Sequence, residues 1–216
     1  MNTFIYTPPQ EPLTILHADD DIVVTDKPAG LLSVPGRGPE RADCLIGRMR
    51  AEFPSVLLVH RLDLDTSGVI VFALTAQAQV HLGQQFEKRR TQKRYVALVS
   101  GHPVEARGQV DLPLIVDWPN RPRQKVCHET GRPAQTDWRV LRQEGENARM
   151  RLTPVTGRSH QLRVHMQALG HPILGDTLYA SGAAADRPRL MLHAEELRLT
   201  HPATGEKMAF RAPVPF

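Results

Sequence analysis

A charged cluster runs directly into a short apolar segment in the first third of the chain. Residues 60–68 read His-Arg-Leu-Asp-Leu-Asp-Thr-Ser-Gly, and residues 69–74 read Val-Ile-Val-Phe-Ala-Leu. A short run rich in β-branched residues predicts a buried strand. The chain therefore enters its core immediately after an arginine, an acid and a turn of Thr, Ser and Gly. Such an arrangement is expected beside a functional site. The alternative is a surface turn with solvated charges, which is the usual meaning of Asp and Ser next to Gly.

The length and composition fit one compact domain. The chain has 216 residues, 41% of them hydrophobic, which is enough for one sizeable core with little room for a second. We expect residues 1–13, which include three prolines, to form an irregular arm and residues 14–216 to form the domain. The 18 prolines exceed the average content of roughly 5% and favour strands and ordered loops over long helices.

Hydrophobic alternation and turn signals predict several strands and few helices. Helices are expected at residues 76–86, with Thr75 as the N-cap, and from about Ser159 to Gly170. Because strands and helices do not alternate strictly, the pattern indicates an α+β domain around a mixed, largely antiparallel β-sheet with a few flanking helices. The strands are expected at residues 20–26, 69–74, 93–100, 135–141, 148–152, 190–200 and 207–211.

The excess of basic residues fits a polyanionic partner, and the few cysteines fit a reducing compartment. The formal net charge is +4 and the isoelectric point is about 9.4, a mild excess that matters only where the basic residues cluster. Cys44 and Cys127 lie far apart and suggest neither a disulfide framework nor a zinc ribbon. No apolar stretch approaches membrane-spanning length, and the N-terminus lacks a signal peptide pattern. We expect a cytoplasmic protein with no membrane association.

The basic residues do cluster, most informatively in a proline-rich loop. This loop holds Trp118, Arg121, Arg123 and Lys125, and a second basic run follows the helix predicted at 76–86. Charge runs are usually solvated faces. Aromatic and guanidinium planes together, however, form surfaces on which unpaired RNA bases stack. We therefore expect the loop to bind RNA.

A second segment, residues 156–166, concentrates arginines and histidines: Thr-Gly-Arg-Ser-His-Gln-Leu-Arg-Val-His-Met. On a helix, His160 and Arg163 share a face, whereas His160 and His165 are five residues apart and do not. This spacing argues against a metal site formed by a histidine pair, which on a helix has i, i+4 spacing. Taken alone, Arg163 is most simply a helix-surface arginine.

Together these segments resemble the signatures HRLDxxTSG and RxHQ[IL]RxH of the RluA family of pseudouridine synthases. The resemblance spans nearly the whole chain and implies the pseudouridine synthase fold for residues 14–216. It implies an isomerase that converts uridine in RNA to pseudouridine with no cofactor and no metal. The reaction breaks the N-glycosidic bond, turns the base and joins C5 to the ribose. One ionised carboxylate can act in it as nucleophile or base.

The resemblance assigns the catalytic carboxylate to Asp63. Asp65 is its competitor, because in an extended chain the two acids would share a face and could act as a glycosidase pair. The family pattern leaves Asp65 at a variable position, so we interpret it as a solvated loop acid. Arg163 is implied as the partner of Asp63, where a guanidinium would keep the acid ionised.

The same resemblance assigns other residues to the RNA. Tyr95 would pack against the target base, although a core tyrosine on a strand is the simpler interpretation of the residue alone. Arg61, together with His60 and His160, would contact RNA, since extruding a uridine leaves a gap that a guanidinium can fill. Lys27-Pro28 is expected mainly to shape the site.

Residues 111–136 narrow the resemblance to a dual-specificity member of the family that acts on large-subunit ribosomal RNA and transfer RNA. The expected partners are stem-loops of 23S rRNA and of tRNA, bound by a monomer. The sequence shows no S4-type module, so the catalytic domain is expected to bind RNA unaided. The alternatives are a single-target rRNA synthase, a non-catalytic RNA-binding module of this fold, and a nuclease or glycosidase that uses Asp63 and Asp65.

Overall fold

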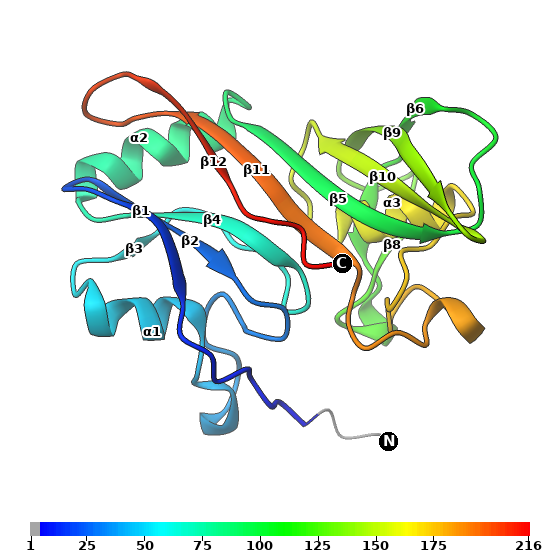
Figure 1. Cartoon of the computed structure of the whole chain (residues 1–216), viewed down its shortest axis with the longest axis horizontal. Helices are drawn as coiled ribbons and strands as arrows, with labels where there is room; N and C mark the ends of the chain where they lie inside the picture. Colours follow the sequence, from blue (N-terminus) through cyan, green and yellow to red (C-terminus); the bar gives the residue numbers. More distant parts are fainter. Residues whose placement is uncertain (1–4) are drawn as a thin grey trace. The chain divides into compact units, whose positions relative to one another are not determined.

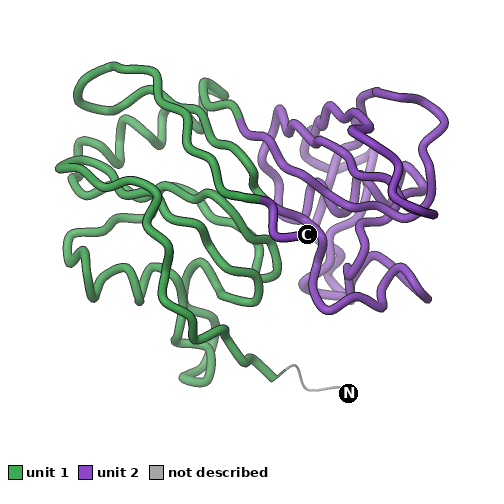
Figure 2. Tube along the Cα trace, in the orientation of Figure 1, with its two compact units in different colours: residues 1–92, 194–213 green, residues 93–193, 214–216 purple. Residues whose placement is uncertain are grey.

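The structure, a computed structural model, describes residues 5–216 (Figure 1). The first four residues of the predicted arm therefore lie outside the described residues. The chain forms two compact units, coloured separately in Figure 2. Unit 1 comprises the chain up to Gln92 together with Ala194–Pro213, and unit 2 comprises Lys93–His193 with Val214–Phe216.

Unit 1 is built on the apolar run that follows the charged cluster. All seven residues of β4 (Ser67–Ala73) are buried, as predicted for the β-branched segment. Helix α2 (Ala76–Glu87) begins after Thr75, whose hydroxyl accepts a hydrogen bond from the Ala78 amide at 3.1 Å. Leu82 of this helix packs into the core beside β4. The strands follow the order β1 (Thr14–Ala18), β2 (Ile22–Lys27), β4 (Ser67–Ala73) and β11 (Leu192–Thr200), with β3 (Leu57–Leu58) beside β4 and β12 (Lys207–Arg211) beside β11. The helices are α1 (Leu45–Glu52) and α2 (Ala76–Glu87).

Unit 2 contains a second group of strands, a separate hairpin and one helix. The strands lie in the order β5 (Gln92–Ser100), β10 (Asn147–Pro154), β9 (Gln135–Glu144) and β6 (Arg107–Asp111), and each neighbouring pair is antiparallel. The hairpin pairs β7 (Leu114–Val116) with β8 (Gln124–Val126), and α3 spans Gln161–Ala168.

The two faces of these strands differ in character. Along β10, Met150 and Leu152 are fully buried and pack with Leu162 and Met166 of α3. The residues that alternate with the buried ones along β10 are only half-buried, because successive side chains of a strand point to opposite faces. One face of the sheet in unit 2 is therefore the core under α3, and the other carries polar side chains.

The α+β class is confirmed, and most predicted elements lie within a few residues of their expected bounds. The helix expected from Ser159 begins only at Gln161, because His160 has a left-handed backbone (φ +53°) and precedes the helix. The sequence did not predict β1, α1, β3, β6 or the β7–β8 hairpin. Within the described chain, no helix is both long and apolar enough to cross a bilayer. The described part of the arm has no regular structure; Tyr6 anchors it by donating to the Asp43 carbonyl at 3.0 Å.

Candidate active site

The segment between β3 and β4 forms a turn that carries both candidate acids. The Thr66 amide donates to the Asp63 carbonyl at 3.2 Å, which closes a four-residue turn with Asp63 first and Asp65 third. The expectation that the two acids would share one face assumed an extended chain. Because the segment turns, that assumption is wrong, and the two carboxylates occupy different positions of the turn.

Buried polar groups anchor this turn within unit 1. The Ser33 hydroxyl donates to the Leu62 carbonyl at 2.7 Å and accepts the Leu62 amide at 3.2 Å. The fully buried Lys27 ammonium donates to the carbonyls of Pro28, Leu31 and Leu64 at 2.7–2.9 Å. These bonds fix the backbone on both sides of Asp63. The prediction that Lys27 shapes the site agrees with this geometry, whereas Ser33 was not foreseen.

Gly68, at the end of the charged cluster, has a backbone that only glycine tolerates. Its φ is +115°, and a Cβ at this position would lie 2.3 Å from the Ala194 carbonyl oxygen. The Thr-Ser-Gly end of the cluster therefore lets β4 begin directly beside β11.

His60 and Arg61 precede the acid in different environments. The His60 ring stacks on Phe86 with centroids 4.4 Å apart, and its Nε2 accepts the Val71 amide at 3.2 Å. This packing makes His60 an anchor between β4 and α2, and its contact with RNA stays a prediction. Arg61 is exposed and makes no hydrogen bond or ion pair with the residues that the structure describes.

Arg163 lies in unit 2, where it forms a buried ion pair with Asp176. Its Nε and Nη2 donate to the two carboxylate oxygens, each at 2.7 Å, and both side chains are at most 3% exposed. Asp176 also accepts the amides of Leu178 and Tyr179 at 3.0 Å. The interpretation of Arg163 as a helix-surface residue is therefore wrong. Its predicted role as the partner of Asp63 stays a prediction.

Two neighbours of Arg163 on the same motif are buried anchors. Gln161 donates to the Gln135 carbonyl at 2.9 Å and accepts from the Thr156 hydroxyl at 2.6 Å. His165 contacts the Leu112 carbonyl at 3.0 Å through Nε2 and the Thr136 hydroxyl at 2.9 Å through Nδ1.

The contact with the carbonyl requires a proton on Nε2 of His165. A carbonyl can only accept, and in the neutral ring Nδ1 then accepts from the Thr136 hydroxyl. Burial lowers the pKa of His165 and favours this neutral form. The histidine therefore holds α3 in place.

Tyr179 connects the parts of unit 2 that the sequence assigned to RNA. Its hydroxyl accepts the Gln124 amide at 2.7 Å and lies 2.7 Å from Nδ1 of His160. The Arg163 guanidinium lies 5.1 Å from its ring centroid. Neither Tyr179 nor Asp176 was predicted; the sequence Gly175-Asp176 offered only a turn signal.

The predicted RNA-binding loop forms the tip of the β7–β8 hairpin. Trp118 is 65% exposed, and the Arg121 guanidinium stacks over its ring at 3.0 Å from the centroid. Arg123 and Lys125 are also exposed. A large exposed aromatic residue covered by a guanidinium forms a flat cationic surface, of the kind on which bases stack.

Tyr95 lies on β5, opposite Leu152 of β10. It is half-buried and packs against the core under α3. The side chain thus belongs partly to the core, as the simpler interpretation of the residue predicts. The predicted contact of Tyr95 with the target base stays a prediction.

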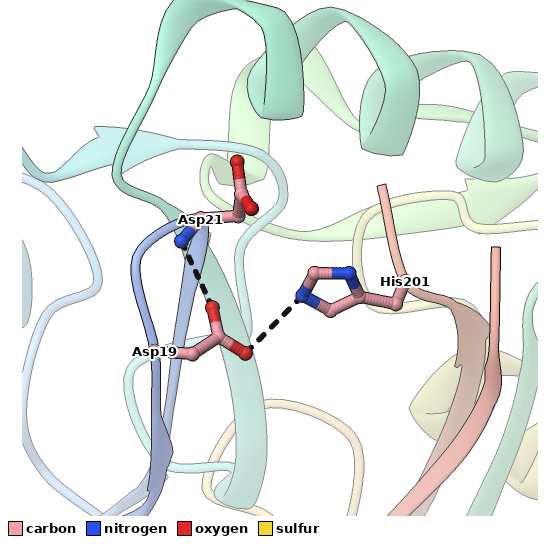
Figure 3. A group of neighbouring side chains, drawn as sticks. All are labelled: Asp19, Asp21 and His201. Carbon is pink, nitrogen blue, oxygen red and sulfur yellow. Dashed lines mark hydrogen bonds and ion pairs between the residues drawn. The ribbon is translucent and has the colours of Figure 1, made fainter. Parts of the chain in front are cut away.

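A separate cluster in unit 1 has metal-ligand spacing: Asp19, Asp21 and His201 (Figure 3). One Asp19 oxygen accepts the amides of Asp21 and Ile22 at 2.8–2.9 Å, and the other contacts Nε2 of His201 at 3.2 Å and Nε2 of His17. Partial burial acts to raise the pKa of Asp19, but these hydrogen bonds outweigh it and lower the pKa to about 2. The carboxylate therefore caps the β1–β2 turn and connects it to His201, the residue that follows β11.

The chain is similar in sequence to a known enzyme family. A family model described as RNA pseudouridylate synthase matches residues 21–168. Proteins named dual-specificity RNA pseudouridine synthase RluA are 60% identical in Escherichia coli K12, over 98% of both chains, and 52% identical in Yersinia pestis, over 94% of this chain and 100% of the relative.

Two solved structures of RNA pseudouridylate synthase domains are also similar to this chain, at lower sequence identity. Human RNA pseudouridylate synthase domain containing 1 superposes with a TM-score of 0.80 at 31% identity, covering 97% of this chain and 87% of the human chain. Human RNA pseudouridylate synthase domain containing 4 superposes with a TM-score of 0.76 at 27% identity, covering 94% of this chain and 88% of the human chain.

Proposed function

This chain belongs to the RNA pseudouridylate synthase family and is an RNA pseudouridine synthase, and we propose that Asp63 supplies its catalytic carboxylate. The reaction breaks the bond from the ribose to N1 and forms a bond from the ribose to C5 of the same uracil. C5 loses its proton and N1 gains one, so the composition of the RNA is unchanged. The carboxylate acts as a nucleophile or as a base on the sugar or the ring.

The observation that carries this proposal is the anchored turn around Asp63. Lys27 and Ser33 bind the backbone of Leu64 and Leu62, the residues on either side of the acid. Catalytic groups need such fixed positions, because a displacement of about 1 Å can cost roughly 100-fold in rate. Asp65 occupies another position of the turn.

The remaining roles complete the proposal. Arg163, held in orientation by Asp176, is the proposed partner of Asp63, and Tyr95 packs against the extruded uracil. Arg61 fills the gap that the base leaves in the RNA. His160 and the hairpin tip with Trp118 contact neighbouring nucleotides. This last role is supported by the link that Tyr179 makes between them.

Substitution of each acid tests the catalytic assignment. Asp63→Asn should abolish pseudouridine formation and leave RNA binding nearly unchanged, because the amide keeps the shape and loses the ionised oxygen. Asp65→Asn, the matched control, should retain most activity. Tritium release from C5-labelled uridine in RNA measures the rate, and filter binding measures the affinity. Equal loss of rate in both variants would contradict the assignment to Asp63.

We further propose that the substrates are stem-loops of 23S rRNA and of the tRNA anticodon arm. The 60% identical relative, which is named a dual-specificity enzyme, supports this proposal. We also propose a cytoplasmic location, which fits two cysteines that form no disulfide. A monomer is the proposed oligomeric state.

A further inference from the structure

The polar face of the sheet in unit 2 carries three arginines in one cross-strand row. Arg107 of β6 is paired in register with Arg139 of β9, and Arg139 is paired with Arg151 of β10. Gln109, Asp137 and Thr153 form the adjacent row, two residues away on each strand. These six residues line an open cavity of about 480 Å³.

Such a row is unfavourable for the folded chain by itself. Like charges placed directly opposite each other on neighbouring strands are destabilising. Other strand arginines in this protein are neutralised. Glu144 binds Arg142 and Arg149, and Glu196 binds Arg198 and Arg211.

The row differs from those pairs in its partners. Arg107 and Arg139 are exposed and make no hydrogen bond or ion pair within the described residues 5–216. The acid in the next row, Asp137, instead accepts from the Gln109 amide at 2.6 Å. Two guanidinium groups on adjacent strands are thus available to an external anion. Strand spacing places the ends of the three-residue row roughly 10 Å apart.

We propose that this face is a second RNA-contact surface, which binds backbone phosphates of the substrate outside the modified loop. Guanidinium groups bind phosphate through paired, charge-assisted hydrogen bonds, and Gln109 and Thr153 add neutral donors. The row lies on the opposite face of the sheet from Leu152, the register partner of Tyr95. It therefore contacts a part of the RNA other than the target nucleotide. The inference rests on the RNA substrate of the proposed function.

The test compares two double variants that remove the same charge. Arg107→Gln with Arg139→Gln removes the proposed phosphate ligands. Arg142→Gln with Arg211→Gln removes two arginines that are 66% and 68% exposed and paired with glutamates. Each is assayed on an isolated tRNA anticodon stem-loop and on the full-length tRNA and 23S rRNA.

For the Arg107/Arg139 variant, we expect KM to rise roughly tenfold on at least one full-length RNA, with kcat unchanged and normal turnover of the stem-loop. The plot of log affinity against log salt for that RNA should become shallower by about 1.5, because two phosphates are no longer bound. The control pair should leave these values near wild type. Thr153→Glu, which keeps the arginines and adds a carboxylate beside them, should reproduce the rise in KM.

Equal KM values and salt slopes for the two double variants on both full-length RNAs would overturn the proposal. The face would then serve an acidic protein partner or keep the β6 edge from pairing with other strands. A wild-type protein that modifies neither the stem-loop nor the long RNAs would instead contradict the proposed function.

Discussion

At the scale of single residues, Asp176 accepts four hydrogen bonds in a buried position, two of them from Arg163. Removing one partner of a buried ion pair leaves the other charge uncompensated, which typically costs about 3–5 kcal/mol. Asp176→Asn should therefore lower the free energy of unfolding by about that amount, measured by urea denaturation. Glu144→Gln weakens ion pairs that are only partly buried and should therefore cost less than Asp176→Asn.

Arg163→Lys keeps the charge but not the planar fork that binds both Asp176 oxygens. Its single-turnover rate should therefore fall severely. A rate near that of the wild type, or an Asp176→Asn protein as stable as the wild type, would contradict the role assigned to this pair.

The sequence identified residues whose signal is local and missed their distant partners. Asp63 and Arg163 stand in short motifs with fixed spacing. The groups that hold them are remote: Ser33 is 29 residues from Leu62, and Asp176 is 13 residues from Arg163. No periodicity or turn rule connects such positions. The burial of Arg163 could not be predicted for the same reason, because only its remote carboxylate makes that burial tolerable.

At the scale of elements, prediction followed the strength of the local pattern. The capping residue Thr75 and the apolar run of β4 gave α2 and β4 almost without error. β6 was missed because Arg-Gly-Gln-Val-Asp has little apolar alternation. The β7–β8 hairpin was missed because prolines at its tip indicate a loop.

The hairpin allows its charge and its aromatic surface to be tested separately. Replacing Arg121, Arg123 and Lys125 together with alanine should weaken RNA binding and make the salt dependence shallower by roughly one for each phosphate that is no longer bound. Trp118→Ala should weaken binding by about 1–3 kcal/mol for one stacked base and leave the salt slope unchanged. Filter binding across a salt series measures both. Wild-type affinity and slope in both variants would identify the tip as ordinary solvated surface.

At the scale of the whole molecule, the residues assigned to catalysis and binding are divided between the two units. Asp63, Arg61 and His60 belong to unit 1, and Tyr95, His160, Arg163 and the hairpin belong to unit 2. Each unit fixes its own set with its own buried contacts: Lys27 and Ser33 in the first, Asp176 and Tyr179 in the second. Both units are therefore needed for the proposed reaction, and we expect neither to be active alone.

The side chains proposed to contact the target loop can reach only a short segment of RNA, and this determines the last prediction. The bases of a small loop can be splayed onto Trp118, Tyr95 and the arginines, whereas paired bases cannot. The purified protein should therefore modify isolated stem-loops copied from a tRNA anticodon arm and from a 23S rRNA hairpin. Because extruding the uridine selects the target, changing loop nucleotides should lower kcat/KM more than exchanging stem pairs of equal stability. Modification of only one of the two stem-loops would instead identify a single-target enzyme of the same family.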